Sequence, residues 1–131
     1  MTSQPGRAAA LPIAVAHAQR WLESLDGRPV PPQAQVEEVM ERLGTTLPDG
    51  PQDPAGVVER LATACEPGLT AMPSGRFYGM VIGGSHPAAL AADWLTSAWD
   101  QNAGLARLTP AATATEQVAS AAGCDPPITI P

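Results

Sequence analysis

The sequence predicts a mainly α protein, and three observations support this prediction. Apolar residues recur at helical spacing in five separate stretches of the chain. Fifteen prolines divide the 131 residues into short pieces, so each helix is restricted to a few turns. Alanine makes up much of the 44% hydrophobic share, and alanine buries little apolar surface. Short, alanine-rich helices are expected to depend on the surfaces against which they pack.

The first helix is expected from Leu11 to Leu25. Its apolar residues repeat every three or four positions, at Leu11, Val15, Ala18, Leu22 and Leu25. Pro12 is tolerated in the first turn, and Gly27 ends the helix. A signal peptide is the alternative, because Arg7 precedes a short apolar run with small residues at suitable cleavage positions. The apolar repeat continues through those positions, which favours the helix.

Two further helices follow a stiff connector at residues 28–32 (RPVPP). One is expected over residues 33–43, where Gly44 stops it. The other is expected over residues 53–65, with Asp53 as its N-cap and a proline in its first turn.

Residues 76–110 contain the most distinctive series of turn and helix-start signals in the chain. A strand-like or extended run near residues 76–82 leads to a glycine turn and a helix over residues 85–101, and a last helix is expected over residues 109–120. The pairing partner of the extended run is expected outside this chain. The turn Gly83-Gly84-Ser85 could present backbone N–H groups to an anion. A simple helix cap is favoured, because neither the P-loop nor the G-x-G-x-x-G pattern is present.

Charge and composition exclude several functions. The net charge of −6 is spread without runs of like charge, which argues against nucleic acid and anionic membranes as partners. No apolar run approaches the roughly 20 residues of a membrane span. All seven basic residues are arginine, so the chain has no lysine to form a Schiff base.

The other reactive side chains have structural interpretations. Cys65 and Cys124 lack metal-binding spacing and are interpreted as thiols in a reducing compartment rather than as a disulfide. His17 and His86 have no nucleophile or carboxylate at catalytic spacing, so we expect structural roles. Two acids of the 85–101 helix would lie about 10.5 Å apart along its axis, too far to share a proton. They are interpreted as solvated or interface acids: Asp93 and Asp100.

A family resemblance rests on the order of four motifs, RFYG, GGS, PAALAADWLTSAWDQN and LTPAAT-x-x-E. This order resembles the N-terminal part of the group II pyridoxal-phosphate-dependent decarboxylases, the family of glutamate, aromatic amino acid, histidine and tyrosine decarboxylases. The connector WL-SL-RPV-P and the P-G-L segment at residues 67–69 also resemble that family. The resemblance extends over about residues 8–118 and is most specific over residues 76–102.

The resemblance implies a fold-type-I, PLP-dependent carboxy-lyase that works as a dimer. Residues 1–75 would form a helical dimerisation arm, and residues 76–118 would begin the large transferase-like domain, which is otherwise missing. Residues 119–131 are interpreted as a divergent tail from a truncated or frame-shifted product or a partial gene model. The family's cofactor-binding lysine, histidine and aspartate lie beyond the matched region. No covalently bound pyridoxal 5'-phosphate is therefore expected on this chain.

The resemblance also assigns a substrate-binding set. Met80, Val81, Ile82 and Gly83 match positions that line the substrate pocket, and Asn102 matches the pocket edge near the dimer partner. No catalytic, cofactor-binding or metal-binding residue is assigned. Glutamate decarboxylases carry polar residues, and aromatic amino acid decarboxylases aromatic ones, at the positions of Met80 and Ile82. Neither substrate is favoured.

Three hypotheses for function follow. The first is an N-terminal fragment of a cytoplasmic PLP-dependent amino acid decarboxylase, acting in carboxylic acid metabolism and not catalytic alone. The second is a helical interaction module that docks on a full-length decarboxylase subunit. The third is an unrelated small helical domain whose glycine turn binds an anion.

Overall fold

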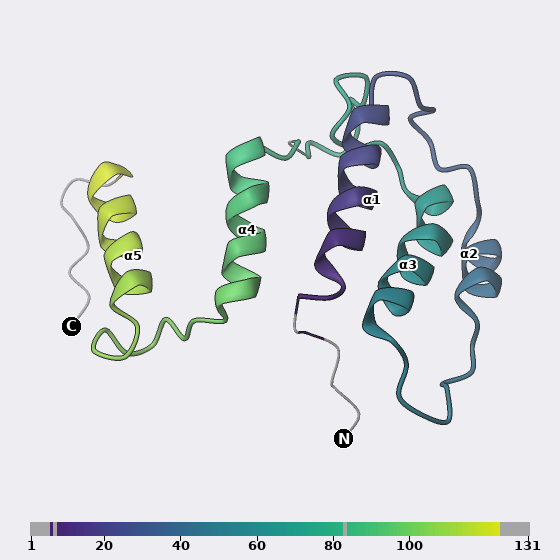
Figure 1. Cartoon of the computed structure of the whole chain (residues 1–131). Helices are drawn as coiled ribbons and strands as arrows, with labels where there is room; N and C mark the ends of the chain where they lie inside the picture. Colours follow the sequence, from purple (N-terminus) through teal and green to yellow (C-terminus); the bar gives the residue numbers. More distant parts are fainter. Residues whose placement is uncertain (1–5, 7, 83, 124–131) are drawn as a thin grey trace. The chain divides into compact units, whose positions relative to one another are not determined.

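The computed structural model of the chain describes Gly6, residues 8–82 and residues 84–123. These residues form five α-helices and one short 3₁₀ helix, and they contain no strand (Figure 1). The chain divides into two compact units, residues 1–84 (unit 1) and residues 85–131 (unit 2). The prediction of a mainly α fold is confirmed.

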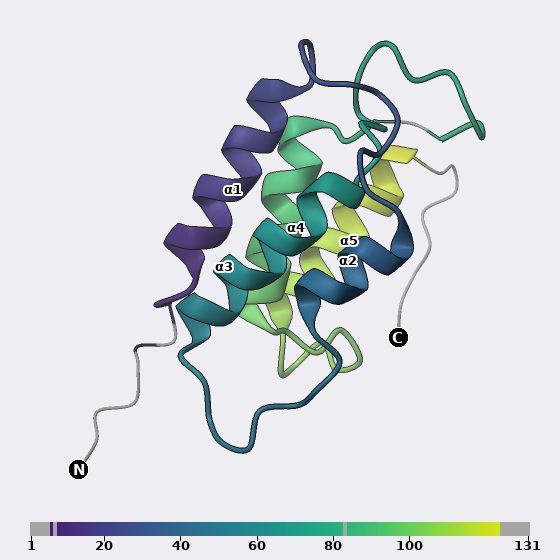
Figure 2. The ribbon, with the colours of Figure 1, turned by 90° about the vertical axis from the view of Figure 1, so that its right-hand side faces the viewer.

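Unit 1 is built from three helices. They are α1 (Leu11–Ser24), α2 (Val36–Leu43) and α3 (Pro54–Cys65), and α3 continues into the 3₁₀ helix η1 (Glu66–Gly68). Helix α3 lies between α1 and α2 and packs against both (Figures 1 and 2). Local signals place the helix starts, since Pro12 stands in the first turn of α1 and the Asp53 carboxylate accepts the Gly56 N–H at 2.9 Å.

Helix α2 begins three residues later than the predicted Gln33. The reason is a tertiary contact, because the N–H groups of Gln33 and Ala34 both donate to the Pro67 carbonyl, at 2.7 and 3.0 Å. Gln35 then caps α2 in a capping box with Glu38. The proline-rich connector is thus held against η1.

The core of unit 1 consists of small side chains. Ala34, Ala64 and Ala71 are buried together with Ser74, and no large side chain is fully buried among the described residues. Close backbone approach replaces bulk at Gly68, where a Cβ atom would lie 2.7 Å from a methyl carbon of Val39. Such a core contributes little apolar area, so the stability of unit 1 depends on close contacts and hydrogen bonds.

Unit 2 contains α4 (Pro87–Trp99) and α5 (Pro110–Gly123). The predicted start at Ser85 is two residues early, because the His86 side chain caps α4 by accepting the Ala88 N–H at 3.2 Å. Helix α4 ends at Trp99 and is followed by Asp100, whose φ of 48° is left-handed. In the described part of unit 2, α4 and α5 do not pack against each other.

The run over residues 76–82 is not a strand, which corrects the strand-like alternative. It turns at Met80 and Val81, whose φ angles are 58° and 54°. A strand needs a neighbouring strand for its backbone hydrogen bonds, and the described residues supply none. None of the described helices has the length and apolar character needed to cross a bilayer.

Candidate functional site

The candidate site begins at Arg76, which fastens its segment to the end of α1. One guanidinium nitrogen, Nη2, donates to the Leu25 carbonyl at 2.8 Å and to the Arg28 carbonyl at 2.6 Å. The Leu25 carbonyl lies just beyond the C-terminus of α1, where helical partners are lacking. Arg76 therefore satisfies two backbone acceptors that are about fifty residues away in the sequence.

Arg28 extends the same junction. Its guanidinium lies 3.6 Å from the centre of the Trp21 ring, donates to Ser24 Oγ at 2.8 Å and approaches a Glu66 carboxylate oxygen at 3.5 Å. These contacts join α1, the proline connector and η1. The segment that follows Arg76 thus leaves from a fixed point of unit 1.

Beyond this anchor the segment becomes exposed. The Phe77 ring lies against Gly79, where an added Cβ would come within 3.1 Å of the ring, whereas Tyr78 is 91% exposed. Of the predicted substrate-binding residues, Met80 is 81% exposed, Val81 is fully exposed and Ile82 is half exposed. The three apolar side chains are presented to solvent, and they line neither of the two hollows described for unit 1.

The backbone of this segment is also strained. A β-branched residue such as Val81 rarely adopts a positive φ, and here it follows Met80, which also has one. Residues in sparsely populated backbone regions cost of order 1–3 kcal/mol each and gather at functional sites. Backbone strain and high exposure at Met80 and Val81 make this turn the best candidate for a site completed by other protein surface.

The remaining two predicted site residues are placed differently. Gly83 lies outside the described residues. Asn102 belongs to unit 2, where its Oδ1 accepts the Gly104 N–H at 2.7 Å and its carbonyl accepts the hydroxyl of the buried Thr109. This hydrogen bonding gives Asn102 a structural role in the loop before α5, and its side chain stays exposed.

The start of α4 is poorly equipped to hold a phosphate. Pro87 has no N–H group, and the Ala88 N–H is already taken by the His86 ring. The sequence also has no lysine. The sequence therefore offers no lysine for an imine bond with pyridoxal 5'-phosphate, and Pro87 and Ala88 offer no free N–H group to its phosphate. A capping role explains His86.

A second polar cluster links α1 to α3. His17 Nε2 lies 3.0 Å from a Glu59 carboxylate oxygen, and Arg20 Nη2 lies 3.0 Å from His17 Nδ1. A guanidinium can only donate, so Nδ1 accepts and the ring hydrogen on Nε2 is donated to Glu59. With both ring nitrogens engaged, His17 serves as a bridge between helices and has no free nitrogen to act as a base.

The hydrogen bond between His17 and Glu59 changes the pKa of the Glu59 carboxyl. The hydrogen bond from His17 lowers the pKa of the Glu59 carboxyl below its ordinary value of 4.5, against a smaller opposing effect of desolvation. Sequence reasoning missed the pair, because 42 positions separate the partners. The one-turn spacing of His17 and Arg20 was the available signal.

No protein-family model, curated protein or solved structure matches this sequence. Among the described residues, no group of three or more histidine, cysteine or acidic side chains could hold a metal ion. The candidate site is therefore the exposed, strained turn at residues 80–82, anchored through Arg76.

Proposed function

We propose that this chain is the N-terminal part of a PLP-dependent amino acid decarboxylase and that it is not catalytic by itself. In this proposal unit 1 is the helical arm, and the turn at residues 80–82 becomes one wall of the substrate pocket when other protein covers it. The proposal rests on the motif order over residues 76–116 together with the exposed apolar surfaces of the molecule. It places the protein in the cytoplasm as a dimer or as a partner of a full-length subunit.

The apolar side chains of helix α4 support the proposal independently of the motifs. Helix α4 has one polar face, made by Asp93, Thr96 and Ser97, and an apolar face on the other side that includes Leu95 and Trp99. An apolar helix face of this kind is normally buried against other protein surface. Yet Leu95 and Trp99 are exposed, Trp99 to 62%, and α5 does not pack on α4. Contact with other protein surface would bury these apolar side chains of α4.

The chemistry of the proposed enzyme would lie outside this chain. Pyridoxal 5'-phosphate, when bound by such an enzyme, supplies the electron sink for loss of the carboxyl group. The residues of this chain would only shape the substrate pocket and exclude water from it. Met80, Val81 and Ile82 offer apolar side chains and no charged group, which suits a substrate side chain without charge.

A helical module that docks on a full-length decarboxylase subunit is the second candidate. Unit 1 supports it, because α3 packs against both α1 and α2, and three polar junctions tie loops and helices together. A unit with its own packing can act as a separate binding module.

Complementation tests the proposal. The chain would be co-expressed with the catalytic part of a group II decarboxylase lacking its own N-terminal arm, and carbon dioxide release would be measured with pyridoxal 5'-phosphate and a panel of amino acids. We expect activity only when both parts are present. Leu95→Asp on α4 should abolish it, whereas Val118→Asp, the same kind of change at a more exposed position on α5, should reduce it less.

The alternatives give different results. Amino acid turnover by this chain alone would refute the proposal, because the sequence has no lysine for an imine. Co-purification with an intact decarboxylase subunit, without complementation of the armless one, would favour the docking module. Failure to associate with either would refute both candidates.

A further inference from the structure

Helix α2 carries an apolar surface that unit 1 leaves uncovered. Its inner side is used, since Val39 lies against Gly68 and α2 packs on α3. Next to this inner side, exposed large apolar residues form a line that continues into the following loop. We call this line the α2 stripe; it consists of Val36, Met40, Leu43 and Leu47. All four are exposed, Leu47 to 88%.

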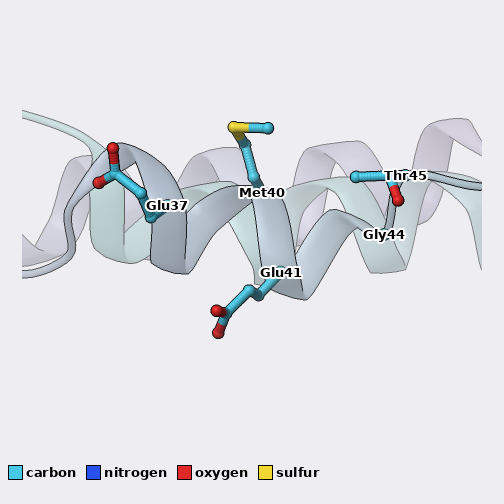
Figure 3. Close-up of a pocket in the computed structure, with 5 residues that line it drawn as sticks. All are labelled: Glu37, Met40, Glu41, Gly44 and Thr45. Carbon is cyan, nitrogen blue, oxygen red and sulfur yellow. The ribbon is translucent and has the colours of Figure 1, made fainter.

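A shallow hollow of about 330 Å³ borders the stripe. It is lined by Glu37, Met40, Glu41, Gly44 and Thr45 (Figure 3). The space beside Gly44 is open, because no atom lies within 4 Å of the position that a Cβ would take, and its φ of 78° favours glycine there. The hollow is therefore bordered by an exposed methionine and two glutamates, and Glu37 points to the same side of α2 as Met40, whereas Glu41 points to the other (Figure 3).

The charges around the stripe are arranged on one flank. Helical geometry, at about 100° per residue, puts the backbone positions of Glu37 and Glu41 on the same flank of Met40 and that of Arg42, the one base of α2, on the opposite flank. Among the described residues neither Glu37 nor Glu41 forms an ion pair. Glu38 is different, because its carboxylate accepts the Gln35 N–H in the capping box.

We propose that the α2 stripe binds an amphipathic helical segment of another protein, with apolar residues along one face and lysine or arginine beside them. The stripe within α2, from Val36 to Leu43, is about 10.5 Å long, which matches roughly two turns of a partner helix. Basic residues on that helix would face Glu37 and Glu41. The proposal is independent of the decarboxylase function.

Charge distinguishes this occupant from a second copy of the chain. The protein carries a net charge of −6, which disfavours a second copy at this acidic surface and favours a basic segment there. The surface is also well held, because the capping box fixes the start of α2 and Val39 anchors its inner side. A fixed surface loses little conformational freedom on binding.

Two fluorescent peptides test the proposal against the full chain. One is an amphipathic helix of leucine, lysine and alanine, and the other has glutamate in place of every lysine. Fluorescence anisotropy should detect binding of the basic peptide and not of the acidic one. Because the contact is partly electrostatic, the dissociation constant should rise with added salt.

Matched variants locate the binding surface. The double variant Glu37→Gln/Glu41→Gln should raise the dissociation constant of the basic peptide about threefold to tenfold. Met40→Gln should raise it at least as much, because it removes the apolar contact. The control Glu23→Gln/Glu116→Gln makes the same change in net charge elsewhere and should leave affinity unchanged. Far-UV circular dichroism would verify that each variant keeps its helices.

Three results would overturn the proposal. Equal binding of both peptides would mean nonspecific adhesion. Equal effects of the Glu37/Glu41 and control variants would mean that only net charge matters. Concentration-dependent self-association that Met40→Gln abolishes would show that a second copy occupies the stripe instead.

Discussion

The two units of this protein differ in how far their short helices are stabilised by packing against each other. Both are built from short helices rich in small residues, but in unit 1 each helix has a neighbour, and in unit 2 the two helices do not pack on each other. Unit 1 also has side-chain links between distant segments, from Arg76 to the end of α1 and from His17 to Glu59. The bonds described for unit 2 are local ones within helices and turns.

This difference teaches what an apolar sequence can and cannot do alone. Helix α4 is more apolar than α2, yet α2 is the one that is packed, because Gly68 and Pro67 offer it a complementary surface. Apolar composition supplies the driving force for burial, whereas shape and hydrogen-bond partners determine where burial takes place.

Hydrogen exchange in the full chain should separate the units most clearly. Helices of the length of α4 and α5 are marginal without a partner. We expect their backbone amides to be protected less than about tenfold, and those of α3 at least about ten times more than those of α4. Equal protection in α3 and α4, measured by mass spectrometry or NMR, would contradict the contrast between the units.

Gly68→Ala should produce the largest effect of a single substitution in unit 1. The new methyl group would meet Val39 at 2.7 Å, so we expect a loss of about 1–3 kcal/mol in the free energy of unfolding, measured in urea. Adding Val39→Ala should restore part of the loss. Gly75→Ala, where no atom lies within 4 Å of the new Cβ, is the control and should cost nothing. Similar losses at both glycines would show that close packing is not the cause.

Arg76→Ala should have a smaller effect. It removes the hydrogen bonds to the Leu25 and Arg28 carbonyls, which should lower the free energy of unfolding of unit 1 by about 1–2 kcal/mol. Arg107→Ala removes an arginine from unit 2 and should leave unit 1 unchanged. If the two variants have equal urea midpoints, Arg76 does not anchor the segment.

The smallest effect concerns pH. The pKa of Glu59 is lowered in the folded protein, so its bond to His17 stabilises unit 1 fully above pH 4.5, and this contribution is lost as the pH falls through the lowered pKa. Glu59→Gln should therefore reduce the part of the acid destabilisation that begins below about pH 4.5. Glu23→Gln is the matched control. Urea midpoints measured between neutral and acidic pH would reveal the difference, and identical profiles for both variants would rule it out.

Most helices could be predicted from the sequence, because their signals are local. Asp53 and Pro54 mark the start of α3, and Gly44 marks the end of α2. The start of α2 was predicted three residues early because Pro67, far along the chain, takes the N–H groups of Gln33 and Ala34. The turn at Met80 and Val81 also escaped prediction, since its positive φ angles have no signature in these residue types.

The candidate site was predicted only as a set of residues. Resemblance selected Met80, Val81, Ile82 and Asn102, but the exposure of the first three and the hydrogen bonds of Asn102 follow from contacts that the motif does not encode. The part played by Arg76 was invisible for the same reason, because its acceptors are backbone carbonyls and carry no residue identity.

The sequence by itself determined the helical class, the helix boundaries to within a few residues and the exclusion of lysine chemistry, since these depend on neighbouring residues or on composition. Only the tertiary structure decided which helices pack, which carbonyls accept from Arg76, which N–H groups donate to the Pro67 carbonyl, and which apolar side chains remain exposed. The physical reason is the sequence separation over which each kind of interaction acts. Capping and turn preferences act over a few residues, whereas burial and hydrogen bonding between segments depend on geometry that forms only when distant parts of the chain meet.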